Sequence, residues 1–150
     1  MSELRELYQE VILDHNKNPR NFREMDPHSH HANGHNPLCG DKLELYLLVQ
    51  NDVIQDISFV GSGCAISTSS ASLMTEFLRG KSVTEAKGLF EHFHDLVTGI
   101  EISDDQLDDL GKLAIFAGVQ EFPARVKCAS LSWHTLMNAL EASQETAQTE

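Results

Sequence analysis

An apolar face that repeats at three- and four-residue spacing is the first regular pattern along the chain. Its positions are Leu4, Leu7, Tyr8, Val11 and Ile12. This spacing predicts a helix over residues 3–15 with Ser2 as its N-cap. Asn18-Pro19 ends the helix, because the residue before a proline avoids helical backbone. The polar segment over residues 20–37 has no clear period, so we predict a loop there, with a short strand near residues 32–36.

Alternation of apolar and polar residues follows, which is typical of strands that bury one face. It runs from Leu43 to Val49 and resumes from Val53 to Phe59, after a polar turn at residues 50–52. The two runs predict an antiparallel hairpin.

Helical spacing takes over after the hairpin. The first of these helices, over residues 65–80, is rich in serine and alanine, which favours close packing against a flat surface. Two capping boxes start the next helices, at residues 82–85 and 103–106, because each serine and the residue three later satisfy each other's backbone amides. The second of these carries apolar positions as far as Ala117. Pro123 begins a final helix that extends to about Leu140.

Strands early and helices late predict an α+β fold. We expect a small three-stranded antiparallel sheet with about five helices packed mainly on one face. At 150 residues the chain fits a single domain over residues 1–150, with residues 142–150 as a frayed tail.

The charge of the chain limits the classes of partner that it can bind. A formal net charge of -12 argues against nucleic acid or an anionic membrane surface, since both require clustered Lys and Arg. No apolar run approaches the roughly 20 residues that cross a bilayer, and the N-terminus is acidic rather than a secretory signal. We therefore expect a cytoplasmic protein.

The three cysteines each stand where a predicted element starts. Cys39 and Asp41 precede the first strand of the hairpin, and residues i and i+2 of an extended backbone point to the same side. Cys64 follows Gly61-Ser62-Gly63 at a helix N-terminus, and Cys128 falls in the first turn of the last helix. A helix N-terminus favours thiolate over thiol.

Taken together, Cys39, Asp41, Cys64 and Cys128 make three sulfurs and one oxygen, a full tetrahedral set for Zn²⁺. Inert buried cysteines and a lone reactive thiol remain alternatives, and an aspartate such as Asp41 is often only a turn or capping residue. Four anionic ligands exceed the charge of the ion, so Arg125 or Lys127 could balance the site, or could be ordinary solvated residues.

The histidines permit a second, weaker hypothesis. His28, His30, His31 and His35 could bind a metal, but an exposed His-rich loop is more often simply solvated.

Three motifs, NPLCGD, GSGCAIS and FPARVKCASLSWHTL, resemble those of the iron-sulfur assembly family related to the N-terminal domain of NifU, which includes IscU and SufU proteins. The resemblance extends from the N-terminal helix to about Leu140. It implies the same α+β fold, with the three cysteines and Asp41 meeting at one end.

Two features resemble the SufU branch of this family. Lys127 stands before the third cysteine, where IscU-type proteins have histidine, and the segment HFHDLVTGIEISDDQLDDLG is similar to an insertion in SufU-type proteins. The branch implies zinc held by the four ligands and sulfur taken from a pyridoxal-phosphate-dependent cysteine desulfurase of the SufS type. Cys39 would leave the zinc and accept a persulfide, and Arg125 would be a docking or charge-balancing residue.

Two other functions stay open at this point. The same ligands could hold a transient [2Fe-2S] or [4Fe-4S] cluster on a non-enzymatic assembly scaffold that serves other cluster assembly proteins. A zinc-stabilised adaptor without sulfur transfer is less attractive, because three cysteines and an aspartate make a more labile site than four cysteines.

Overall fold

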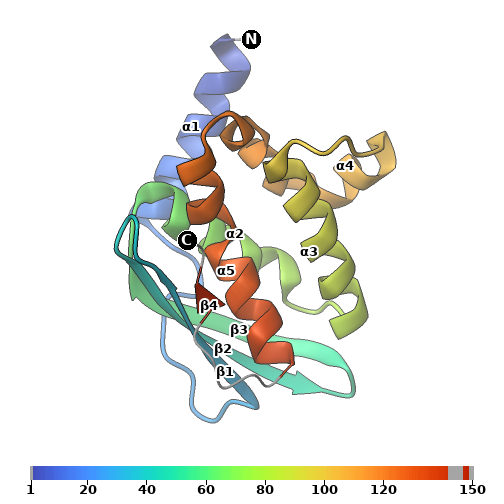
Figure 1. The fold of residues 1–150 in the computed structure, drawn as a ribbon. Coiled ribbons are helices and arrows are strands. Elements are labelled where there is room, and N and C mark those ends of the chain that lie inside the picture. Colours follow the sequence, from blue (N-terminus) through green and yellow to red (C-terminus); the bar gives the residue numbers. More distant parts are fainter. Residues whose placement is uncertain (1, 142–146, 149–150) are drawn as a thin grey trace.

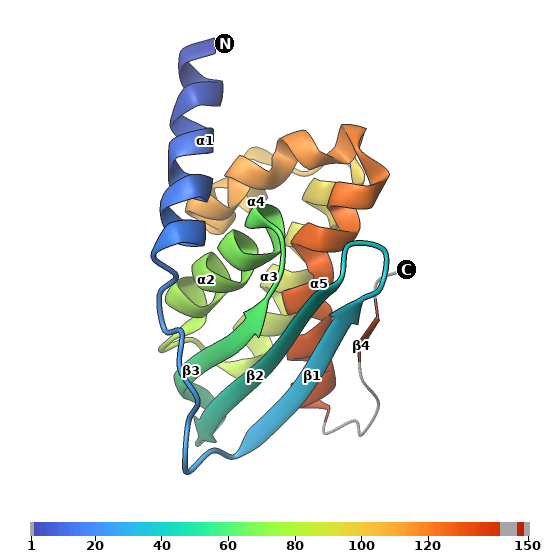
Figure 2. The same ribbon diagram turned by 90° about the vertical axis from the view of Figure 1, so that its left-hand side faces the viewer.

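The fold is a small sheet covered by helices on one face (Figures 1 and 2). A computed structural model describes residues 2–141 and 147–148 of the chain. The elements, in chain order, are α1 (Ser2–Lys17), β1 (His30–Asn36), β2 (Asp41–Gln50), β3 (Val53–Ser62), α2 (Ala65–Leu78), α3 (Val83–Thr98), α4 (Asp104–Leu110), the 3-10 helix η1 (Gly111–Glu121), α5 (Pro123–Leu140) and β4 (Ala147–Gln148). The predicted α+β class is confirmed.

Three antiparallel strands form the body of the sheet in the order β3-β2-β1, and the short β4 continues it beside β1. The predicted hairpin is β2 and β3, and its turn places Asn51 and Asp52 at positive φ, a conformation that Asn and Asp tolerate. Of the expected tail over residues 142–150, only Ala147–Gln148 lies within the described residues. These two residues form β4, parallel to β1.

The short strand predicted near residues 32–36 is confirmed as β1, which begins two residues earlier than expected, at His30. The inward positions of β1 are Ala32, Gly34 and Asn36, which are small or polar and so hide the strand pattern. Gly34 packs tightly against α5, because a Cβ there would lie 2.1 Å from the Thr135 hydroxyl oxygen. β1 is thus held by contact with a helix rather than by large apolar side chains.

The helical layer packs its core around aromatic rings. Trp133 on α5 stacks on Phe93 of α3 at 4.8 Å between ring centroids, and Phe93 meets Phe116 edge-on at 5.9 Å. On the other side, the serine-rich face of α2 lies against α5, where the Ser70 hydroxyl donates to the Ala129 carbonyl at 2.6 Å. Small side chains let these two helices approach closely, so the predicted close packing is present, here against a helix rather than a flat surface.

Both predicted capping boxes are present, at Ser82 and Ser103. The second helix is shorter than expected, because α4 ends at Leu110 and Gly111 turns the backbone to a positive φ of 53°. The segment beyond it forms η1 instead of continuing α4 to Ala117. Among the described residues, none of the helices combines the length and the apolar character needed to cross a bilayer.

A buried histidine joins α1 to α2. The His15 ring is 2% exposed, and its Nδ1 lies 2.7 Å from the Ser72 hydroxyl oxygen. Burial lowers the pKa of His15 below its usual 6.5, against the opposing charges of Glu76 and Asp14. His15 therefore holds α1 in place in its neutral form.

We expect this contact to weaken in acid. Below pH 6.5 the unfolded chain binds a proton that the folded His15 resists, so the free energy of unfolding decreases as the pH is lowered. Urea unfolding of metal-free protein at about pH 7.5 and about pH 5.5 checks this against His15→Gln. The variant should start roughly 1–3 kcal/mol less stable and lose less on acidification. Equal losses in the two proteins would contradict the assignment.

Candidate metal centre

The turn between β1 and β2 presents the first two predicted ligands. Asn36 and Asp41 are the last pair of the ladder, and the Gly40 N–H donates to the Asn36 carbonyl at 2.8 Å. Gly40 has a φ of 75°, which a side chain would disfavour. Cys39 is consequently exposed in the turn, while Asp41 opens β2 and points inward, fully buried. The tight turn, rather than the extended backbone we expected, brings Cys39 and Asp41 together.

Cys64 lies at the start of α2, as the sequence predicts. It is the N-cap residue, and its Sγ accepts the Ser67 N–H at 3.4 Å. Its own N–H donates to Asp41 Oδ1 at 2.9 Å. The preceding Gly63 makes this approach possible, because a Cβ there would lie 2.8 Å from the same carboxyl oxygen. The start of α2 is therefore fixed on Asp41.

Cys128 lies deeper than its sequence position suggests. It is the sixth residue of α5, which places it in the second turn rather than the predicted first, and it is fully buried. Burial raises the pKa of the Cys128 thiol far above its usual range, and the neighbouring Cys39, Cys64 and Asp41 add to the rise. The expected stabilisation of thiolate by the helix N-terminus is therefore overridden at Cys128.

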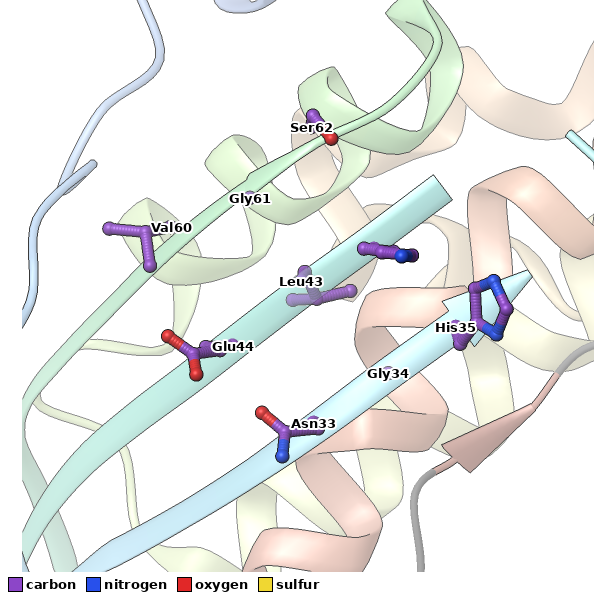
Figure 3. Close-up of a pocket in the computed structure, with 9 residues that line it drawn as sticks. Asn33, Gly34, His35, Leu43, Glu44, Val60, Gly61 and Ser62 are labelled. Carbon is purple, nitrogen blue, oxygen red and sulfur yellow. The ribbon is translucent and has the colours of Figure 1, made fainter. Parts of the chain in front are cut away.

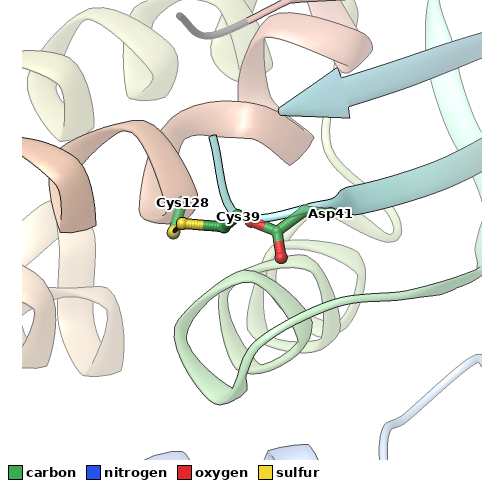
Figure 4. Close-up of side chains that lie close together, drawn as sticks. All are labelled: Cys39, Asp41 and Cys128. Carbon is green, nitrogen blue, oxygen red and sulfur yellow. Dashed lines mark hydrogen bonds between the residues drawn. The ribbon is translucent and has the colours of Figure 1, made fainter. Parts of the chain in front are cut away.

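Three of the four predicted ligands, Cys39, Asp41 and Cys128, lie close together (Figure 4). Among the described residues, Cys39, Asp41 and Cys128 offer three donor atoms within 4.8 Å of one another, and the two sulfurs are 3.4 Å apart. Cys64 Sγ lies 4.0 Å from Asp41 Oδ2, beside this group. Three sulfurs and one oxygen suit Zn²⁺, and a divalent cation would let these crowded groups be anionic together. The residues present fit the metal.

The two predicted cations differ in their relation to this cluster. Arg125 is exposed in the first turn of α5, and hydrogen bonding to Cys128 together with the negative charge of Cys64 raises its pKa. Arg125 is thus placed to balance the excess negative charge of the ligands. Lys127 is half-buried, and among the described residues it has no hydrogen bond or ion pair to this cluster.

Sequence reasoning did not single out Asn36, although it begins the NPLCGD motif. Its side chain is fully buried, and its amide Nδ2 lies 3.3 Å from Asp41 Oδ2 and 3.6 Å from Cys128 Sγ. A polar residue at an inward position of a strand, next to a candidate ligand, is the pattern that could have identified it.

The four histidines of the predicted second centre lie in three different surroundings. His28 and His31 pack around the ring of Tyr46, at 5.2 and 4.8 Å between centroids, and His30 Nδ1 lies 2.8 Å from the Ser29 hydroxyl. His35 lines a hollow of about 530 Å³ on the open face of the sheet (Figure 3). Among the described residues, these histidines do not bring three donor atoms within reach of one ion.

Comparison with known proteins places this site in a family. The family model described as the NifU-like N terminal domain matches residues 7–129. The chain belongs to this family. It is 43% identical over 130 residues to the zinc-dependent sulfurtransferase SufU of Bacillus subtilis, covering 87% of this chain and 86% of that protein. It is 39% identical over 143 residues to the iron-sulfur cluster assembly scaffold protein IscU of Streptococcus pyogenes, covering 95% and 88% of the two chains.

A solved structure supports the same assignment. The crystal structure of a putative iron-sulfur cluster assembly scaffold protein for the SUF system, from Fervidobacterium islandicum AW-1, superposes with a TM-score of 0.82 at 35% identity. It covers 87% of this chain and 94% of its own. The NifU-like family resemblance predicted from the three cysteine motifs is confirmed.

The contact between Gly63 and Asp41 provides a test of the site. Gly63→Ala would push a methyl group against the Asp41 carboxyl group, so we expect affinity for added zinc to fall roughly tenfold or more. Chelator competition measures the affinity. Gly88→Ala is the matched control, because a Cβ at Gly88 meets no heavy atom within 4 Å. Equal zinc affinity in the two variants would remove Asp41 from the proposed site.

Proposed function

We propose that this protein is a zinc-dependent sulfur acceptor that takes a persulfide onto Cys39 from a pyridoxal-phosphate-dependent cysteine desulfurase of the SufS type and passes it on for iron-sulfur cluster assembly. One observation carries the proposal. An exposed thiol, Cys39, lies 3.4 Å from the buried Cys128 thiol, at the edge of a donor set that suits zinc. The name of the B. subtilis relative supports it.

The proposed ligands of zinc are Cys39, Asp41, Cys64 and Cys128. Bound zinc would keep the thiols deprotonated while it moderates their reactivity. Arg125, whose pKa is raised by the same sulfurs, offsets part of the excess negative charge and presents a cation to the partner. Lys127 is the neighbouring candidate for docking.

Cys39 is the residue suited to react with a partner. It is exposed in the turn beside Gly40, whereas Cys128 is buried and Cys64 caps α2. The Cys39 thiolate attacks the outer sulfur of the persulfide on the desulfurase cysteine. A sulfur–sulfur bond forms on Cys39, the one on the desulfurase breaks, and the desulfurase cysteine leaves as a thiolate with the electron pair.

A second candidate function rests on the same residues. Three cysteines and one aspartate can also ligate an iron-sulfur cluster, and the S. pyogenes relative is named a scaffold. A scaffold would be purified with iron and labile sulfide and would work with other cluster assembly proteins. The exposed position of Cys39 suits transfer of sulfur to and from partners better than protection of a cluster from solvent.

If the protein accepts sulfur, both stimulation of the desulfurase and the added sulfur should depend on the Cys39 thiol. Wild-type protein, purified in air, should contain about one zinc per chain. It should also speed the turnover of a cysteine desulfurase severalfold and gain one sulfur atom, about 32 Da, on Cys39. Cys39→Ser should lose both the stimulation and the added sulfur. Peptide mass spectrometry after reaction with the desulfurase and cysteine locates the sulfur.

The control is Cys64→Ser, which makes the same atom replacement at the N-cap of α2 and leaves Cys39 in place. We expect looser zinc in this variant, with the added sulfur still on Cys39. Normal stimulation by Cys39→Ser would rule out the proposed transfer. A coloured wild-type protein that contains iron and sulfide and does not stimulate the desulfurase would favour the scaffold.

A further inference from the structure

Asn36 occupies an unusual place beneath the proposed metal centre. It is the last residue of β1, pairs with Asp41 across the ladder, and is 0% exposed. Fully buried amides are uncommon unless they are hydrogen-bonded, because burying a polar group without a partner costs free energy. The contacts of this side chain therefore indicate why an amide stands here.

The two ends of the Asn36 amide differ in their hydrogen bonding. Nδ2 donates to Asp41 Oδ2 at 3.3 Å and approaches Cys128 Sγ at 3.6 Å, so one NH₂ group bridges two of the proposed ligands. Oδ1 is buried and has no hydrogen-bond partner among the described residues. An apolar side chain of similar shape would avoid that orphaned oxygen, so packing alone does not account for asparagine at this position.

We propose that Asn36 is a positioning residue of the metal centre, which holds Asp41 and Cys128 together as the pair that retains the metal and leaves Cys39 free to move. The inference rests on the proposed function. It explains through one side chain why Cys39, rather than Cys128 or Asp41, would leave the metal. The structure gives Asn36 no hydrogen bond to Cys39 among the described residues, whereas Cys128 and Asp41 are both within reach of its amide.

The chemistry of the amide fits this role. Asn36 donates hydrogen bonds without adding a negative charge, where an aspartate would add a fifth acidic group to an already crowded set. An N–H donor directed at a thiolate spreads the charge on the sulfur. Hydrogen-bond partners of this kind orient the metal ligands and change their affinity for the metal. Cys128 and Asp41 gain this support, and Cys39 does not.

The sharpest variant is Asn36→Leu, which keeps the approximate shape and removes both the donor and the orphaned oxygen. We expect zinc affinity, measured by chelator competition, to fall roughly 10–100-fold, as is typical when such a partner is lost. The metal-free variant should melt near the wild-type temperature, because removal of the unpartnered oxygen offsets the loss of the donor to Asp41 Oδ2. Asn33→Ala is the matched control, since Asn33 lies on the same strand but is exposed on the opposite face.

A double-mutant cycle separates positioning from general loosening of the site. If Asn36 acts through Cys128, the losses of zinc affinity in Asn36→Leu and Cys128→Ser should not multiply in the double variant. With Cys39→Ser they should multiply, because Asn36 and Cys39 are not bonded. The visible spectrum of cobalt-loaded protein should also differ between Asn36→Leu and wild type, since it reports the geometry of the ligands.

Several outcomes would overturn the inference. They are unchanged zinc affinity in Asn36→Leu, multiplying losses with Cys128→Ser, or a cobalt spectrum identical to that of wild type. If Asn36→Leu does not fold, Asn36→Ser takes its place with the same expectations for zinc. Failure of wild-type protein to bind zinc would instead refute the proposed function, so the two failures are distinguishable.

Discussion

The buried carboxyl group of Asp41 is the point on which this end of the molecule depends. A buried acidic group is tolerated only with hydrogen-bond partners, and Asp41 finds them on two separate elements. The Cys64 N–H at the start of α2 donates to one oxygen, and the Asn36 amide at the end of β1 donates to the other. Gly63 leaves room for the contact. Satisfying one side chain therefore fixes the relative positions of β1, β2 and α2.

The remaining cysteines are arranged unequally around that fixed point. Cys128 enters from α5, which the Ser70–Ala129 hydrogen bond ties to α2, and it is buried with a raised pKa. Cys39 approaches it from a solvent-exposed turn, in which the Gly40 N–H donates to the Asn36 carbonyl. The same cluster thus combines a rigid, buried part with an accessible thiol, which is the combination that a sulfur acceptor requires.

The sequence predicts features that depend on local chemistry. The capping boxes at Ser82 and Ser103 and the hairpin of β2 and β3 follow from spacing alone, and the cysteine motifs identify the family. The strand predicted near residues 32–36 begins two residues earlier, at His30, and its inward residues, such as Gly34, are selected by contact with α5 rather than by an apolar alternation. The raised pKa of Cys128 and the role of Asn36 arise from burial and cross-strand pairing, which no local pattern reports.

We propose that one metal ion is held by residues of the β1–β2 turn, the start of α2 and the second turn of α5. X-ray absorption at the zinc edge of zinc-loaded protein is the sharpest test of this site. We expect three sulfur ligands at about 2.3 Å and one oxygen at about 2.0–2.2 Å. Two or fewer sulfurs, or the scattering pattern of a histidine ring, would contradict it.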